Sequence, residues 1–144
     1  MHDEAIRALE AELTDLMRRQ RARARAVARE VHPRLEPANF PLLVVLGRDG
    51  AQRLSTLREV LGLDTSTVSR QIDAVERMGL VRRVPDPADA RARLVELTEE
   101  GRTRLEHQRR EHLRRLHEAL ATWPEDEIRV LTRMLRRLGD GVLD

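Results

Sequence analysis

Ser66, Thr67, Ser69 and Arg70 place three hydroxyls and one guanidinium within five consecutive positions. Hydroxyl and guanidinium groups donate hydrogen bonds to phosphates and to the edges of bases. Small hydroxyls also occur as ordinary residues in the first turn of a helix, where they satisfy free backbone amides. Which of these two roles applies depends on the elements that present the four side chains.

Signatures of catalysis and of metal binding are weak in this sequence. It has no Gly-rich phosphate loop, no Gly-x-Ser-x-Gly or His-Glu-x-x-His motif, no lysine and no cysteine. His107, His112 and His117 are five residues apart, so successive imidazoles differ by about 140° around a helix and do not converge on one ion. His107 and Glu111 have better spacing, but solvated histidines are the simpler interpretation. We therefore predict no enzyme, no catalytic residues, no metal and no cofactor.

Length and composition suit one soluble domain of 144 residues, with 36% charged and 40% hydrophobic residues. No apolar run approaches the roughly 20 residues that a membrane span needs. The first 16 residues contain five acids, which is unlike a signal peptide. These features predict a cytoplasmic protein that does not contact a membrane. The lack of cysteine excludes disulfides and a thiol-based oxidation switch.

Charge is distributed unevenly, although the net charge is only +2 and by itself predicts no partner. All 27 basic residues are arginine, and residues 18–34 contain seven of them against the single acid Glu30. Residues 1–16 contain five acids and Arg7. A long helix with acids at its positive end and arginines at its negative end accounts for this pattern. Contact between the arginine run and phosphates is the alternative.

Apolar residues spaced by three and four predict long helices at both ends of the chain. One spans about 3–31, another runs from Thr98 to about Ala121, and a last helix follows Pro124 and ends at Gly139. A short buried helix begins after Asn39 and ends at Gly47 and the Asp49-Gly50 turn. The terminal helices flank the central segment, yet each has an apolar stripe that must be buried. A monomer could fold these helices on each other, but extended helices that flank a compact middle more often pair across a two-fold axis, which predicts a homodimer.

The central segment reads as two short helices followed by a β-hairpin. The first helix starts at Leu54, the residues 62–64 form a tight connection, and Asp64 caps the second helix, which Gly79 ends. The apolar stripe of this second helix leaves five residues facing away from it, namely Ser66, Thr67, Arg70, Asp73 and Arg77. Strand-like runs at 80–84 and 94–97 flank a predicted hairpin tip at 85–90.

Residues 54–98 resemble the winged helix-turn-helix of the MarR family of bacterial transcriptional regulators. The matching segments, in order and at family spacing, are Leu61-Gly62-Leu63, Ser66-Thr67-Val68-Ser69-Arg70, Val75-Glu76-Arg77-Met78-Gly79-Leu80-Val81, Asp86-Pro87-Ala88-Asp89-Ala90-Arg91-Ala92 and Leu97-Thr98-Glu99-Glu100-Gly101. The resemblance implies a mainly α fold with a small β-hairpin wing, in which long terminal dimerisation helices flank the winged domain. It implies a single domain over 1–144. Residues 1–36 and 99–144 would form the helical dimerisation region, and residues 37–98 the DNA-binding region.

By this resemblance the protein is a homodimer that binds double-stranded DNA, most often as a repressor on a pseudo-palindromic operator. The helix after Asp64 enters the major groove, and Ser66, Thr67, Ser69 and Arg70 are the residues expected to contact DNA. The wing motif Asp89-Ala90-Arg91 places Arg91 near the minor groove or its phosphates. An ion pair with Asp89 that shapes the hairpin is the competing role for Arg91, and both roles hold if the carboxylate orients the guanidinium toward DNA. Arg93 is expected either to contact the DNA backbone or to decorate an exposed strand.

The resemblance also implies release from DNA by a small-molecule effector. The corresponding segments, 17–28, 40–44 and 107–116, contain arginines and almost no aromatic surface, which favours an acidic effector. Surface charge is the alternative role of these arginines, and no ligand-binding residue is assigned. A helical dimeric module that uses its winged helix to bind another protein is the alternative function.

Two residues depart from the helix-turn-helix pattern. Arg58 stands four positions before Gly62, where such sequences commonly have a small residue. It either extends outward along the helix edge or shifts the crossing of the two helices. Pro41 lies early in the short buried helix that begins after Asn39, and it is expected to delay the start of that helix.

Overall fold

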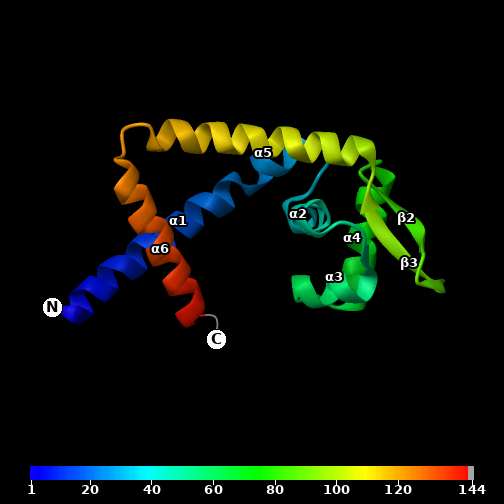
Figure 1. The fold of residues 1–144 in the computed structure, drawn as a ribbon, viewed down its shortest axis with the longest axis horizontal. Coiled ribbons are helices and arrows are strands. Elements are labelled where there is room, and N and C mark those ends of the chain that lie inside the picture. Colours follow the sequence, from blue (N-terminus) through cyan, green and yellow to red (C-terminus); the bar gives the residue numbers. More distant parts are fainter. Residues whose placement is uncertain (143–144) are drawn as a thin grey trace. The chain divides into compact units, whose positions relative to one another are not determined.

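The computed structural model describes residues 1–142, and the chain in it divides into two compact units with their boundary after Gln108, inside a long helix. The two units are described one at a time. The elements in chain order are α1 (His2–Val31), the 3-10 turn η1 (Pro37–Asn39), α2 (Phe40–Asp49), β1 (Gln52–Arg53), α3 (Leu54–Leu61), α4 (Thr65–Arg77), β2 (Val81–Asp86), β3 (Asp89–Leu97), α5 (Glu99–Leu120) and α6 (Glu125–Val142) (Figure 1). The predicted fold class, mainly helical with a small β wing, is confirmed.

The core of the first unit lies where α2, α3 and α4 meet the sheet. Its fully buried side chains include Leu42, Leu46, Leu57, Ile72 and Leu80. Burying aliphatic side chains of this size provides about 1.5–3 kcal/mol each, so this cluster is the main source of stability. The predicted inward stripe of α4, which consists of Val68, Ile72 and Val75, is confirmed because all three side chains are inaccessible to solvent.

The turn between α3 and α4 depends on Gly62. Its φ of +64° lies in the left-handed region, which residues with a Cβ rarely adopt. This conformation brings the amide of Leu63 within 3.2 Å of the Arg58 carbonyl oxygen, which closes the end of α3. Asp64 then caps α4, because its Oδ1 accepts a hydrogen bond from the Thr67 amide at 2.7 Å. The predicted helix, glycine turn and capped helix are all present.

The β-hairpin is longer than predicted, and its tip is only Pro87 and Ala88. The predicted tip at 85–90 is wrong because Pro85 lies within β2, at an irregularity in the pairing with β3 where a missing backbone donor is tolerated. The carboxylate of Asp86 accepts the Ala88 amide at 2.9 Å and thereby closes the tip. The whole of the wing motif from Asp89 onward therefore belongs to a strand.

A third strand, β1, was not predicted. It has only two residues, and it pairs antiparallel with β3 through Gln52 opposite Val95 and Arg53 opposite Leu94. The sheet order is β1-β3-β2, so β3 is the central strand. Two residues between a helix end and a helix start carry no detectable alternation of apolar and polar residues, so a strand of this length cannot be predicted from the sequence.

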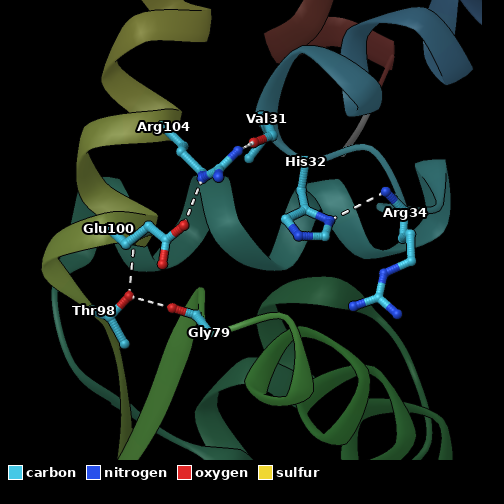
Figure 2. A network of polar contacts seen from close by, with 8 residues as sticks. Val31, His32, Arg34, Gly79, Thr98, Glu100 and Arg104 are labelled. Atoms are coloured by element: carbon cyan, nitrogen blue, oxygen red, sulfur yellow. Dashed lines mark hydrogen bonds and ion pairs between the residues drawn. The ribbon is translucent and has the colours of Figure 1, made fainter.

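Thr98 joins the end of α4, the base of the wing and the start of α5 (Figure 2). Its hydroxyl donates to the Gly79 carbonyl oxygen at 2.6 Å and accepts from the Gly101 amide at 3.0 Å. Gly101 is packed so closely that a Cβ there would lie 2.0 Å from the Leu80 carbonyl oxygen. The start of α5 is thus fixed directly on the segment that follows α4.

The end of α1 is held by the first turns of α5 (Figure 2). Arg104 donates to the Val31 carbonyl oxygen at 3.1 Å and pairs with Glu100 at 2.9 Å. The adjacent His32 accepts the Arg34 amide through Nδ1 at 3.1 Å. Burial, together with the positive charges of Arg104 and Arg34, lowers the pKa of His32 below its usual value. These contacts fix the chain where it leaves α1 for the winged domain.

The predictions that Gly47 and Gly139 end helices are wrong, whereas the predicted turn at Asp49-Gly50 does end α2. The helix α2 continues through Gly47 to Asp49 and ends at Gly50, whose φ is +77°. Gly47 is instead a point of close approach, because a Cβ there would lie 2.6 Å from the Leu105 side chain. The helix α6 likewise continues through Gly139 to Val142. A glycine ends a helix where the chain needs a positive φ, and neither Gly47 nor Gly139 has one.

The second unit contains the later part of α5 and the helix α6, which begins after Pro124 as predicted. Acids occupy the first turn of α6, at the positive end of the helix dipole. Large apolar side chains of this unit remain exposed, namely Leu113, Leu116, Val130, Leu131, Met134 and Leu135. Within residues 1–142, no helix has both the length and the hydropathy required to span a bilayer.

Candidate nucleic-acid interface

One face of α4 is exposed along its first two turns and carries polar side chains. Because Val68, Ile72 and Val75 occupy the inward face, the spacing of the helix turns Ser66 and Arg70 outward. Both of these residues are exposed, whereas Thr67 and Ser69 are half-buried at the edges of the face. The structure therefore brings together the four residues that the sequence predicted on this helix.

Asp64 organises the beginning of this face. Its Oδ1 accepts hydrogen bonds from the Thr67 amide and from the Ser66 hydroxyl, each at 2.7 Å. These bonds lower the pKa of the Asp64 carboxyl to about 2, so the group is ionised at any physiological pH. The Ser66 hydroxyl donates toward the protein, which leaves its oxygen lone pairs available to an incoming donor.

The guanidinium of Arg70 is directed along α4 toward the N-terminal end of the helix. Its Nη2 lies 3.4 Å from the Thr67 Oγ1, a long contact that leaves most of its donors unused. An arginine with free paired donors forms bidentate bonds to guanine, which is the most common specific contact in the major groove. This geometry suits Arg70 for the reading role predicted for it.

The wing presents Arg91 and Arg93 on β3, and both side chains are exposed. They are two residues apart, so they lie on one face of the strand. Asp89 accepts the backbone amide of Arg91 at 2.9 Å. Among residues 1–142 the structure has no ion pair between the Asp89 carboxylate and the Arg91 guanidinium, so this alternative role of Arg91 is wrong. The guanidinium is left free to contact a ligand.

Ion pairs that the sequence did not reveal hold α4 and the wing in place. Arg83 on β2 donates to Asp73 at 2.7 Å and to Glu76 at 2.5 Å, and both acids lie on α4. Arg53 on β1 donates to the nearly buried Asp86 at 2.7 Å, at the far end of the hairpin. These ion pairs could not be predicted from local residue spacing, because the partners are 7–33 residues apart in sequence.

Arg58 extends outward, which confirms one of the two predicted arrangements. Its side chain is exposed on α3, and its Nη1 lies 3.4 Å from the Oγ1 of Thr65, the first residue of α4. The packing of α3 and α4 is retained, because Leu57 of α3 and Val68 of α4 are fully buried in the same core cluster. The list of outward-facing residues on α4 is therefore unchanged.

The other candidate sites of the sequence are exposed surface. Within the described part of the chain, no three His, Cys, Asp or Glu side chains are grouped to hold a metal ion. In the arginine run at 18–34, Arg18 and Arg19 both pair with Asp15 on α1. This pairing uses two of the seven arginines locally and lowers the pKa of Asp15.

The chain matches known proteins both in sequence and in fold. The model of the MarR family matches residues 35–92. The chain is 33% identical over 110 residues to the uncharacterized HTH-type transcriptional regulator YxaD of Bacillus subtilis, covering 76% of this chain and 77% of that protein. A solved MarR family protein from Bacillus stearothermophilus is 28% identical, with 96% of this chain and 98% of that chain covered and a TM-score of 0.75.

A third similarity concerns the fold alone. Streptococcus pneumoniae FabT, solved in complex with DNA, is 21% identical to this chain. The alignment covers 96% of this chain and 98% of that one, with a TM-score of 0.84.

The fold and the exposed face of α4 define a winged helix-turn-helix protein. The chain belongs to the MarR family of winged-helix transcriptional regulators. The family and the relatives matched here are regulators of transcription, so the protein is a regulator and not an enzyme.

Proposed function

We propose that the protein acts as a homodimeric repressor that binds a pseudo-palindromic operator. Each subunit places α4 in the major groove, with the two copies about 34–36 Å apart, one turn of the duplex. Ser66, Thr67, Ser69 and Arg70 contact the bases and nearby phosphates, while Arg91 and Arg93 contact the DNA from the wing. The observation that carries the proposal is the exposed face of α4, where hydroxyls and a guanidinium stand beside a wing with two free arginines. The DNA complex of FabT, which has the same fold, supports it.

Exposed apolar side chains on the terminal helices support a dimer. On α1 they are Ile6, Leu9, Leu16 and Met17, each at least half exposed. Leu131, Met134 and Leu135 on α6 are more than two-fifths exposed. Stripes of this kind on long helices are usually buried against a second subunit. We propose 1–36 and 99–144 as the dimerisation region and 37–98 as the DNA-binding region of a single-domain subunit.

Effector release belongs to the proposal as well, and the ligand we expect is an acidic small molecule. Inside the first unit, an open hollow is lined by Arg34, Ala74, Arg77 and Met78, which all lie outside the segments 17–28, 40–44 and 107–116 that the resemblance indicates. Two guanidinium groups beside apolar surface favour a carboxylate with an apolar body. A screen of acidic compounds for those that abolish a DNA shift tests this part.

A gel shift tests the proposed function. A labelled fragment of the DNA upstream of the protein's own gene, at near-physiological salt and with excess competitor DNA, is expected to be retarded. Binding is expected to fall steeply as salt rises, because arginine contacts to phosphates release counterions. A fragment that stays free, together with capture of a specific protein by the winged domain, would favour the protein-interaction module instead. Binding that does not depend on salt contradicts the proposal.

A further inference from the structure

Arg58 is an exposed cation beside the start of α4 that the fold does not require. It lies on α3, and within residues 1–142 the one hydrogen bond of its side chain is the 3.4 Å approach of Nη1 to the Thr65 Oγ1. Hydrogen bonds of this type normally measure 2.7–3.2 Å, so the contact is weak and the other guanidinium donors are unused. Among residues 1–142, no carboxylate forms an ion pair with Arg58.

We propose that Arg58 binds a DNA phosphate at the edge of the α4 contact, an inference that rests on the proposed binding of α4 to DNA. Helix-turn-helix sequences commonly have a small residue at this position. In this protein α3 would therefore contribute a phosphate contact in addition to those of α4 and the wing. The Thr65 hydroxyl holds the guanidinium loosely on the α4 side of α3.

The charges around the start of α4 support this role. The Asp64 carboxylate is ionised and exposed there, and a carboxylate so close to the bound duplex repels phosphates. Arg58 reaches Thr65, the residue next to Asp64, and Arg70 lies one turn further along α4. Two guanidinium groups thus lie close to the Asp64 carboxylate and offset its charge. A planar guanidinium also matches the oxygens of a phosphate in a two-point contact.

A purely structural role explains Arg58 less well. The turn between α3 and α4 is already fixed by the left-handed Gly62, by the bond from the Leu63 amide to the Arg58 carbonyl and by the Asp64 cap. The helices are held together by the buried Leu57 and Val68. A long contact between two exposed side chains adds little to such an arrangement. The side chain of Arg58 is therefore available for a ligand.

The test measures the salt dependence of DNA binding by fluorescence anisotropy. It uses the chain of residues 1–144 and two duplexes, one obtained by selection from a random pool and one of random sequence, between about 50 and about 200 mM salt. Arg58→Met removes the charge and keeps an unbranched apolar stem, whereas Arg58→Lys keeps the charge. Arg7→Met removes the same charge from α1, outside the winged domain, and is the control.

Arg58→Met is expected to make the slope of log K against log salt less negative by about 0.9 for each bound subunit, on both duplexes alike. Arg58→Lys is expected to keep most of the wild-type slope, and Arg7→Met all of it. Thermal unfolding of Arg58→Met is expected to match that of the wild type.

Three results would overturn the inference. The first is an unchanged slope in Arg58→Met while the wild type binds, with or without a lower unfolding temperature. The second is a change confined to the selected duplex, which would identify a base contact instead. The third is a wild type that binds neither duplex at about 50 mM salt, and this result alone also refutes the proposed function.

Discussion

Arg70 and Arg91 are both exposed arginines, but the structure places them differently. Arg70 stands on the outward face of a helix that fits the major groove, whereas Arg91 projects from the central strand of the wing. A helix that lies in the groove reaches the edges of bases, and a wing at the flank reaches mainly sugars and phosphates. The two residues are therefore expected to differ in what their loss does to sequence preference.

Arg70→Ala is expected to weaken binding to the preferred duplex by about 1–3 kcal/mol and to relax its sequence preference, because a bidentate base contact is lost. Arg91→Ala is expected to weaken binding to all sequences alike if it contacts only the backbone. Competition titrations with single-base variants of the duplex measure both effects. Full tolerance of both substitutions would remove these residues from the interface.

Asp64 makes the stability of α4 depend on pH in the acidic range. Its folded-state pKa of about 2 lies below the ordinary value of 3.8, so the ionised form is favoured in the folded state. The stabilisation of the folded state by the ionised Asp64 carboxylate is complete above about pH 4 and is lost as the pH falls toward 2. Asp64→Asn keeps a good cap without a titrating group.

Urea unfolding at several pH values checks this expectation. The free energy of unfolding of the wild type is expected to exceed that of Asp64→Asn above about pH 4, and this difference is expected to disappear as the pH falls to about 2. A constant difference between the two proteins across this range would show that the Asp64 cap is not charge-assisted. Asp15 and Asp86 also have lowered pKa values, so the comparison with the variant is needed to isolate Asp64.

Among the elements, those with a strong local pattern were predictable and those that depend on distant partners were not. The three-four spacing of apolar residues located α1, α3, α4 and α5 to within a few residues. The outward face of α4 followed from the same spacing. The strand β1 was missed because its two residues are a strand only through pairing with β3. The length of the hairpin was missed because Pro85 reads as a turn signal, although it lies in β2.

The ion pairs that hold α4 and the wing in place also could not be predicted from the sequence. Arg82 and Arg83 are equivalent in sequence as neighbouring arginines. In the structure Arg82 pairs with Glu96 across the hairpin, whereas Arg83 reaches two acids of α4. Alternation of side chains along a strand separates the two, but which face meets α4 depends on packing.

The junction at Gly101 is expected to tolerate no side chain. In Gly101→Ala the new Cβ would lie 2.0 Å from the Leu80 carbonyl oxygen, which is backbone and cannot turn aside. We expect a loss of stability at or above the upper end of the about 1–3 kcal/mol that overpacking usually costs. Urea unfolding measures it, with Gly141→Ala as control, since a Cβ there meets nothing within 4 Å. Equal stability of the two variants would contradict the close packing at Leu80.

At the scale of the whole molecule, the exposed stripe of α6 is the feature that most needs a partner. Leu131 and Leu135 are one turn apart, and they are 42% and 51% exposed. Changing both to Glu is expected to convert a dimer into monomers and to abolish high-affinity binding, because one winged domain contacts only half of an operator.

Sedimentation and a gel shift of the same samples check this expectation. The matched control is Arg133→Glu with Arg137→Glu, two positions further on and about 200° around the helix. The control is expected to remain dimeric, although its net charge changes more than that of the double Leu→Glu variant. A double Leu variant that stays dimeric and binds DNA normally would place the subunit interface elsewhere.

The start of α5 is fixed directly on the segment that follows α4. Thr98 bonds to Gly79 and Gly101, and Gly101 packs against the backbone of Leu80. The first turns of α5 and the end of α4, which belong to the same compact unit, are therefore expected to move as one piece. Any change that reorients this first part of α5 would carry the end of α4 with it, without any side chain of the exposed face of α4 having to move first.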